Sequence, residues 1–159
     1  MKFTLRTYAP EDFESLYEID QQCFEDEIAY TRRDMRAYLN YPGAECVVAE
    51  TTRGKIGGFC IAARRGHLGY VITMDVLPKY RRKGVAATLL AEAERRLGER
   101  DVREMWLETA TDNEAAIAFW LRHGYRKRGV REGYYPDGRD AFTMQKNLTA
   151  PQDGGTSQL

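Results

Sequence analysis

The chain has 159 residues, of which 24 are Lys or Arg and 24 are Asp or Glu, so its formal net charge is zero. This length suits one domain with its own core, which is predicted to cover residues 1–148. The balanced charge provides no overall field that attracts nucleic acid or an anionic membrane, so neither is a predicted partner. The polar N-terminus and the lack of an apolar run of transmembrane length predict a cytoplasmic protein.

The three cysteines, Cys23, Cys46 and Cys60, lie within apolar patterns and lack the spacing of a metal site. Their odd number and their surroundings indicate reduced thiols in a core. No metal site is therefore predicted.

The first part of the chain is predicted to form one strand, two helices and then an antiparallel meander. The second helix has the pattern of an N-cap at Thr31, because Asp34 follows three residues later. The predicted ranges are 3–6 for the first strand, Pro10 to Phe24 and Thr31 to near Pro42 for the helices, 46–50 and 55–63 for strands, and 64–69 for a turn.

The stretch from residue 70 to residue 97 is the centre of the predicted fold. A β-branched, apolar run from Val71 to Leu77 predicts a buried strand that stops at Pro78. The apolar residues of 85–97 fall on one stripe with a period of 3.6, which predicts an amphipathic helix.

A basic turn joins this strand to this helix and consists of Arg81, Arg82, Lys83, Gly84, Val85 and Ala86. The first amide N–H groups of a helix lack intrahelical partners and carry partial positive charge, so a phosphate is a natural ligand there. Gly84 removes a side chain that would keep an anion from the backbone, and the cations add positive charge. The alternative is a solvated basic turn whose glycine only relieves backbone strain.

Residues 104–110 are predicted as another strand, and a strand-helix-strand unit of this length implies parallel pairing through a right-handed crossover. Thr111, Asp112 or Asn113 can cap the next helix, which Gly124 closes. The last strands are predicted at 125–130 and 141–148, joined by a loop at 132–139, and the tail at 149–159 is predicted to be disordered.

Three separated motifs then coincide with this order of elements. They are Val76-Leu77-Pro78 at the strand end, Arg81-x-x-Gly84-x-Ala86 in the turn, and Asn113-x-x-Ala116-x-x-Phe119-Trp120-x-x-x-Gly124-Tyr125 around the later helix. Together they resemble the GNAT superfamily of acetyl-CoA-dependent N-acetyltransferases, over roughly residues 3–148. Tyr134-Tyr135-Pro136, with Asp140-Ala141 and Met144, resembles the branch that acetylates protein N-termini, including that of a ribosomal protein.

The resemblance implies an α/β (α+β) fold. This fold is a mixed, mostly antiparallel twisted sheet of about seven strands with four helices, in which a central parallel strand pair splays apart around the cofactor. The cofactor implied is acetyl-CoA. The resemblance implies three kinds of contact with it: backbone groups along the pantetheine arm, amides at the pyrophosphate, and packing. The residues implied are Met74, Asp75, Val76, Arg81, Arg82, Lys83, Gly84, Val85, Ala86, Asn113 and Trp120.

The resemblance also implies a general base at Glu108, on the strand 104–110. Because side chains alternate along a strand, Glu108 faces away from Leu107 and can face the slot between the splayed strands. A protein α-amine has a pKa of about 7.7–8.0, against about 10.4 for lysine, so one base is enough for an N-terminus. The alternative is a solvent-facing glutamate, or one paired with an arginine such as Arg103.

Two positions depart from the branch. Trp120 stands where a tyrosine normally protonates the departing thiolate, and indole cannot deliver that proton. Either the CoA thiol leaves without an acid, or Tyr134 or Tyr135 serves as the acid in place of the missing tyrosine. In both cases Trp120 is expected to pack against the cofactor arm. Ala29-Tyr30-Thr31 replaces a proline-aromatic-serine run, which bears on peptide specificity.

The acceptor side is predicted to contain an aromatic rim of Tyr30, Tyr134 and Tyr135 around a peptide N-terminus. The alternative is three ordinary loop tyrosines. An acidic loop at 25–27 either attracts a cationic substrate or is simply solvated.

The leading hypothesis is an acetyl-CoA-dependent N-acetyltransferase that acts on a protein or peptide amine by direct attack, as a monomer or homodimer. The second is a GNAT enzyme for a small-molecule amine such as a polyamine, an amino sugar or an antibiotic. The third is a non-catalytic acyl-CoA sensor. Nucleic-acid binding is disfavoured, although Arg122, Arg126, Lys127, Arg128 and Arg131 form a local basic cluster.

Overall fold

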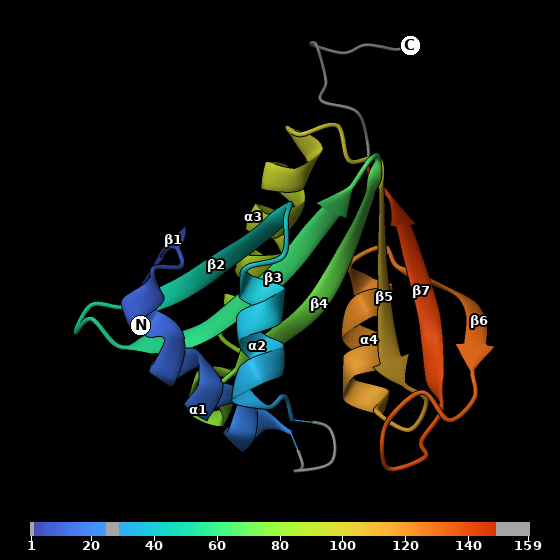
Figure 1. The fold of residues 1–159 in the computed structure, drawn as a ribbon, viewed down its shortest axis with the longest axis horizontal. Coiled ribbons are helices and arrows are strands. Elements are labelled where there is room, and N and C mark those ends of the chain that lie inside the picture. The colour runs from blue at the N-terminus through green and yellow to red at the C-terminus, as the bar shows by residue number, and fades with distance from the viewer. Residues whose placement is uncertain (1, 25–28, 149–159) are drawn as a thin grey trace.

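The computed structural model describes residues 2–24 and 29–148 (Figure 1). Within these ranges seven strands form one sheet, in the order β1-β2-β3-β4-β5-β7-β6. The strands are β1 (Phe3–Thr7), β2 (Ala44–Thr51), β3 (Ile56–Arg65), β4 (Leu68–Val76), β5 (Glu104–Ala110), β6 (Arg126–Arg131) and β7 (Ala141–Asn147). The helices are α1 (Phe13–Cys23), α2 (Arg32–Leu39), α3 (Val85–Gly98) and α4 (Glu114–Arg122), with short 3₁₀ turns at Pro10–Asp12 and Pro78–Tyr80.

The sheet is mixed, which confirms the predicted fold class. Neighbouring strands are antiparallel except β4 and β5, which are parallel. This pair is joined only where Leu68, Gly69 and Tyr70 face residues 104–106. Beyond Tyr70 the two strands diverge, and Figure 1 shows β4 leaning away from β5 toward their C-terminal ends.

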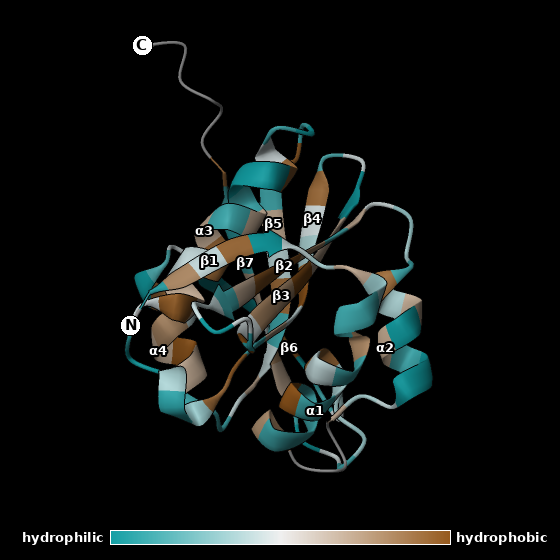
Figure 2. Ribbon diagram, turned by 90° about the vertical axis from the view of Figure 1, so that its left-hand side faces the viewer, coloured by the Kyte–Doolittle hydropathy of each residue, from teal (hydrophilic) through white to brown (hydrophobic). Residues whose placement is uncertain are grey.

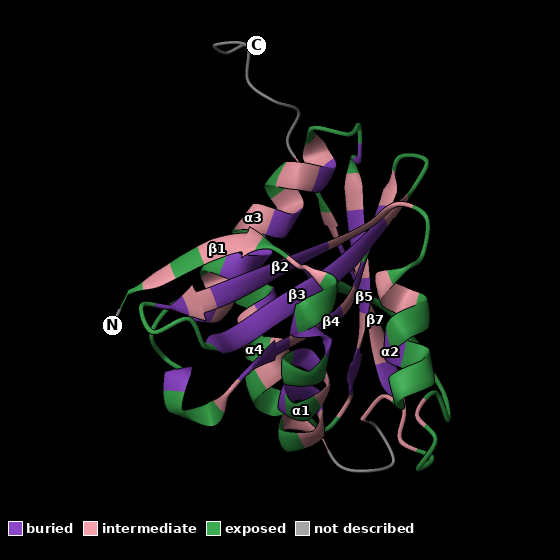
Figure 3. Ribbon diagram, turned by 60° about the vertical axis from the view of Figure 1, so that its left-hand side comes forward, coloured by how far each residue is buried: buried purple, intermediate pink, exposed green. Residues whose placement is uncertain are grey.

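Helices cover both faces of the sheet. α1 and α2 pack on one face, in a core cluster built around Phe13, Leu16 and Met35, and α3 packs on the other, around Leu89 and Leu97. Figure 3 shows that the buried residues concentrate in β2 and β3, and Figure 2 shows hydrophilic residues on the outer side of α2. Among the residues that the structure describes, no helix is both long and apolar enough to cross a bilayer.

Helix ends follow the capping patterns of the sequence. The Thr31 hydroxyl accepts a hydrogen bond from the Asp34 N–H (3.0 Å), which confirms the predicted N-cap of α2. Of the three candidates for the cap of α4, Asn113 serves, because its side-chain oxygen accepts from the Ala116 N–H (3.1 Å). Gly124 ends that helix region with a φ of 94°, a left-handed conformation that glycine adopts at little cost.

The predicted turn at 64–69 is too long. β3 continues to Arg65 and β4 begins at Leu68, because Arg64 pairs with Gly69 and Arg65 with Leu68. Arg64 and Arg65 lack the apolar pattern of a strand, so the sequence did not predict this part of the ladder. The acidic loop at 25–27 and the tail at 149–159 lie outside the described residues.

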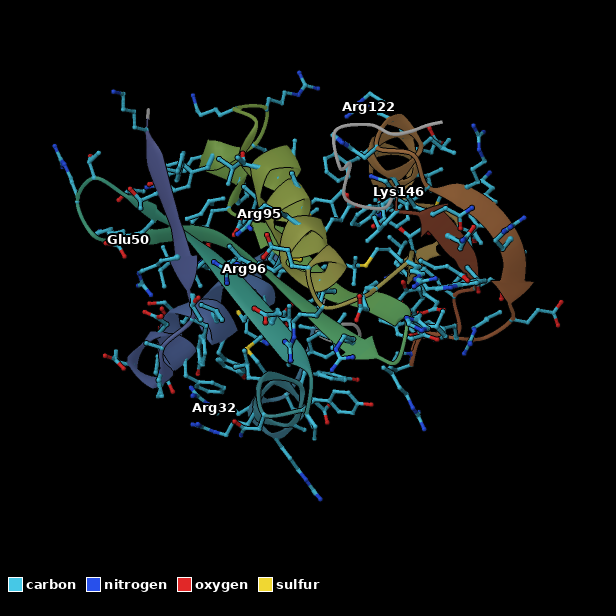
Figure 4. The ribbon with its side chains drawn as sticks, turned by 90° about the horizontal axis from the view of Figure 1, so that it is seen from above. Arg32, Glu50, Arg95, Arg96, Arg122 and Lys146 are labelled. Atoms are coloured by element: carbon cyan, nitrogen blue, oxygen red, sulfur yellow. The ribbon has the colours of Figure 1, made fainter. Side chains whose placement is uncertain are left out.

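Polar contacts hold α3 to both halves of the diverging sheet. Arg96 donates to the Thr7 hydroxyl (3.0 Å) and lies 3.6 Å from Glu45 on β2. On the other side, Glu94 pairs with Lys146 of β7 (2.8 Å) and accepts a hydrogen bond from Tyr125 (2.7 Å). Figure 4 shows α3 lying between the labelled Arg96 and Lys146. The helix thereby bridges the place where β4 and β5 separate.

The short join between β4 and β5 gives a test of packing. A Cβ at Gly69 would lie 2.5 Å from the Met105 Sδ and 3.0 Å from Val102, both buried. We expect Gly69→Ala to lower the free energy of unfolding by about 1–3 kcal/mol, because the core must shift to admit a methyl group. Gly129→Ala on the exposed strand β6 meets no atom within 4 Å and is the matched control. Urea unfolding of both variants measures the difference, and equal stability would contradict the packing at Gly69.

Candidate active site

The edge of β4 that faces the divergence presents free backbone groups. The Leu77 N–H donates to the Gly57 carbonyl (2.9 Å), so the backbone of Leu77 points toward β3. Because successive residues of a strand point to opposite neighbours, Met74 and Val76 then point away from β3, toward β5. The backbone groups of Met74 and the Val76 N–H can form strand-like hydrogen bonds with an extended ligand arm, whereas the Val76 carbonyl already accepts from the Arg81 Nε.

Asp75 differs from the prediction that grouped it with Met74 and Val76. By the same alternation its backbone groups point toward β3, where Asp75 pairs with Phe59. Its side chain is almost completely buried. The structure therefore gives Asp75 no backbone group facing the divergence.

Arg81 has partners within the protein, and its predicted contact with the cofactor stays a prediction. Its Nε donates to the Val76 carbonyl (2.8 Å), and its Nη2 lies 3.5 Å from the Cys23 Sγ. The guanidinium group therefore closes the end of β4 against α1. All three cations of the turn before α3 are exposed, and Arg82 and Lys83 remain available beside Arg81.

The N-terminus of α3 has the geometry of an anion site. Gly84 is the N-cap residue with a φ of 79°, and Arg82 has a φ of 63°, so the turn contains two left-handed residues. Among the described residues, no protein group accepts a hydrogen bond from the backbone N–H groups of residues 82–87. A Cβ at Gly84 would meet no atom within 4 Å. Exposed amides, the helix dipole and two cations together fit a diphosphate.

Glu108 lies on β5 where this strand has parted from β4. Leu107 is buried in the core on the α3 side, so Glu108 points to the opposite face, as the alternation predicted. Its side chain is only 16% exposed, and its Oε2 lies 3.6 Å from the Arg131 Nε. The predicted alternative, a pair with Arg103, is not the observed contact. A half-buried carboxylate beside the divergence is placed to accept a proton.

Of the tyrosines predicted for the acceptor side, Tyr134 lies near Glu108 with Tyr135 packed against it, and Tyr30 is anchored on β4. The Tyr134 hydroxyl lies 3.5 Å from the Glu108 Oε1, and the ring of Tyr134 packs edge-on against Tyr135 with centroids 5.0 Å apart. The Tyr30 hydroxyl donates to the Ile72 carbonyl (3.1 Å), and its ring lies 5.0 Å from that of Tyr38. Tyr30 and Tyr134 are close enough to influence each other electrostatically.

The loop tyrosines carry their protons at neutral pH. Burial raises the pKa of Tyr134, and the neighbouring Glu108 carboxylate adds to this rise. Burial also raises the pKa of Tyr135, to about 12, with Tyr134 as the next cause. Both hydroxyls are therefore hydrogen-bond donors, and whether either replaces the acid that is missing at Trp120 stays a prediction.

Trp120 and Asn113 have structural roles of their own. Trp120 is 8% exposed and packs against Phe119 and Tyr125, with ring centroids 5.1 Å and 5.5 Å away. Asn113 caps α4 through its side chain. Contacts of either residue with a cofactor stay predictions.

Sequence analysis missed two residues that the fold brings to this site. Arg131 faces Glu108 from β6, and Tyr38 of α2 packs on Tyr30. Arg131 lies on a different strand from Glu108, and no spacing rule relates the two residues. Tyr38, next to the last residue of the short helix α2, carried no signal beyond ordinary packing.

Comparisons with known proteins agree with this geometry. The profile of the Acetyltransferase (GNAT) family matches residues 13–125. An N-alpha-acetyltransferase of Saccharolobus solfataricus is 38% identical over 81 residues, which are 50% of this chain and 48% of that protein. The [Ribosomal protein bS18]-alanine N-acetyltransferase of Escherichia coli is 29% identical over 147 residues, covering 89% of this chain and 95% of that protein.

A solved structure has the same fold. The crystal structure of the ribosomal-protein-S18-alanine N-acetyltransferase from Escherichia coli superposes with a TM-score of 0.84 and 24% identity, over 98% of this chain and 99% of that one. The profile match covers most of the chain, so the protein belongs to the GNAT acetyltransferase family. Members of this family use acetyl-CoA, which confirms the predicted cofactor class. The chain aligns with about half the length of the archaeal relative.

The turn before α3 gives a test of cofactor binding. Gly84→Ala places a side chain on a left-handed residue, which costs about 1 kcal/mol and displaces the amides. We expect the dissociation constant for CoA, measured by calorimetry, to rise about fivefold or more. Gly133→Ala is the matched control, because Gly133 also has a positive φ (61°) and open space but lies in the β6–β7 loop. Equal CoA affinity in the two variants would contradict the assignment of the turn.

Proposed function

We propose that the protein is an acetyl-CoA-dependent N-acetyltransferase whose acceptor is the α-amine of a protein or peptide. The observation that carries this proposal is the position of Glu108, half-buried on β5 beside the divergence from β4 and next to Tyr134. The relatives whose names specify N-alpha or ribosomal-protein-alanine acetylation support the acceptor class. A cytoplasmic N-terminus, such as that of a ribosomal protein, fits this class.

The turn before α3 and the edge of β4 hold the donor in this proposal. The amides of residues 82–87 bind the pyrophosphate, and the backbone groups of Met74 and the Val76 N–H extend the sheet along the pantetheine arm. When bound, acetyl-CoA supplies an acyl thioester. The divergence of β4 and β5 leaves room for this arm without breaking any existing ladder bond.

Glu108 and the tyrosines handle the acceptor. The amine nitrogen attacks the thioester carbonyl, the C–S bond breaks, and Glu108 takes the proton that the amine loses. The thiolate leaves unprotonated or takes a proton from the Tyr134 or Tyr135 hydroxyl. Because the pKa of each tyrosine is raised above that of a thiol, departure as the thiolate is the favoured route. Tyr30, with Tyr134 across from it, borders the peptide N-terminus.

The acceptor class is tested with a panel of amines. Purified protein is incubated with acetyl-CoA and one acceptor at a time, and the release of free thiol is followed. The acceptors are a short peptide with a free N-terminal alanine, the same peptide with a blocked N-terminus and an internal lysine, spermidine, and an amino sugar. We expect turnover with the free N-terminus and much less with the others. Turnover confined to spermidine or the amino sugar would overturn the peptide assignment, and CoA binding without any turnover would overturn the enzymatic one.

The role of Glu108 is tested by an isosteric change. Glu108→Gln removes the proton acceptor, so we expect kcat for the peptide to fall by about 100-fold or more, while the CoA dissociation constant is unchanged. Glu104→Gln, on the same face of the same strand, is the matched control and keeps wild-type kcat. A kcat for Glu108→Gln equal to that of Glu104→Gln would show that Glu108 is not the base.

The pH dependence follows from the acceptor amine. An α-amine is a nucleophile only when deprotonated, so kcat/KM for the peptide should rise with pH and level off above about 8. A rise that continues toward pH 10 would indicate a lysine side chain instead, because its pKa is about 10.4. Initial rates between pH 6 and pH 10, at constant ionic strength, distinguish the two.

A further inference from the structure

Two buried carboxyl groups face each other next to Tyr30. Asp20 on α1 and Asp75 on β4 are each 1% exposed. One oxygen of each group is satisfied: the Asp75 Oδ1 accepts from the Thr73 hydroxyl (2.8 Å), and the Asp20 Oδ2 accepts from the Tyr30 N–H (2.7 Å). The other two, Asp20 Oδ1 and Asp75 Oδ2, have no hydrogen-bond partner among the described residues.

A single proton satisfies both unpartnered oxygens. The two carboxyl groups lie within hydrogen-bonding reach of each other, yet ionised carboxylates are acceptors only and cannot bond to one another. A buried acceptor without a donor costs about 1–3 kcal/mol, and two like charges in contact cost more. With a proton on Asp75, its hydroxyl donates to Asp20, and every oxygen of the pair has a partner.

The surroundings of the pair favour one proton over none. Burial raises the pKa of Asp75 well above its usual range, and Asp20 is the second cause. The ionisable groups that face Asp75 come from α1, β3, the segment after β4 and the loop before α2, and they are Asp20, Cys23, Cys60, Arg81 and Tyr30.

The two thiols and the phenol among these neighbours add no charge at neutral pH. Burial raises the pKa of the Cys23 thiol to about 11 and that of Cys60 to about 12, and it raises the pKa of Tyr30 as well. One remaining negative charge on the pair is then balanced by Arg81.

We propose that Asp20 and Asp75 share one proton and act as positioning residues for the acceptor site, with the Asp75 hydroxyl donating to Asp20 and Asp20 holding the Tyr30 amide. Two further hydrogen bonds hold Tyr30. Its carbonyl accepts from the Gln21 side-chain amide (2.9 Å), and its hydroxyl donates to the Ile72 carbonyl (3.1 Å).

Ile72 is the extra residue of an irregularity in β4, since Thr73 pairs with Ile61 and Val71 with Ala62. The shared proton thus joins α1, β4 and the tyrosine that borders the acceptor. Only the acceptor part of this inference rests on the proposed function.

The shared proton has a defined effect on stability. The pKa of Asp75 is higher in the folded chain than in the unfolded chain, where it is about 3.9, so folding takes up a proton between these two values. The unfolded state binds fewer protons there, and the free energy of unfolding therefore falls as pH rises above about 4, until the pKa of the folded state is passed. In Asp75→Asn, the side-chain amide can donate to Asp20, but it has no proton that is lost in this pH range.

The test compares Asp75→Asn with the wild-type protein, and uses Asp34→Asn on the exposed side of α2 as the matched control. At neutral pH, we expect an infrared C=O band of a protonated carboxyl group in the wild type and in Asp34→Asn, and its loss in Asp75→Asn. Urea unfolding across pH 5 to pH 8 should show a decline of stability in the wild type that is reduced in Asp75→Asn. Absence of the band in the wild type, or the same decline in Asp75→Asn, overturns the shared proton.

The positioning role is tested by kinetics. We expect Asp75→Ala to raise KM for the peptide about tenfold, because the Asp20 Oδ1 loses its donor and the Tyr30 amide its fixed acceptor. The KM for acetyl-CoA should stay at the wild-type value, and Asp75→Asn should return the peptide KM toward that of the wild type. Equal effects on both KM values, or no recovery with asparagine, would overturn positioning. If no amine is acetylated, the infrared and urea measurements still decide the shared proton, and only the proposed function fails.

Discussion

The separation of β4 from β5 after three residue pairs is the constraint on which the rest of the structure depends. A parallel ladder that continued would use the backbone groups of Met74 and Val76 within the sheet and would bury Glu108 against β4. Because the strands part, those groups and that carboxylate lie beyond the last paired residues of β4 and β5. α3 bridges the two parts of the sheet through Arg96 on one side and Glu94 on the other.

Electrostatics in this protein are local, as the zero net charge requires. Positive charge gathers where the amides of residues 82–87 are exposed, and negative charge is limited near the acceptor. Glu108 faces Arg131 across β7, while Arg81 lies beside the buried carboxyl pair.

The sequence predicted most of the fold because its local signals agree. The strand 104–110 was placed with correct bounds, and Thr31 and Asn113 cap their helices as expected. The turn at 64–69 was placed wrongly because strand pairing there involves arginines. Local pattern carries no information on such a ladder.

The candidate site was predictable only where one segment contains it. Gly84 and the amides after it belong to one turn, and the structure shows them free as expected. The direction of the Asp75 backbone groups follows from the pairing of β4 with β3, which the sequence does not reveal. The contact between Asp20 and Asp75 joins residues 55 positions apart, and no spacing rule relates them.

The account depends most on where CoA binds. Titration of acetyl-CoA into ¹⁵N-labelled protein, followed by the shifts of assigned backbone amides, reports this directly. We predict that the largest changes occur at the amides of residues 82–87 and of Met74 and Val76. Largest changes at the outer strands β1 and β6, with residues 82–87 unaffected, would contradict it.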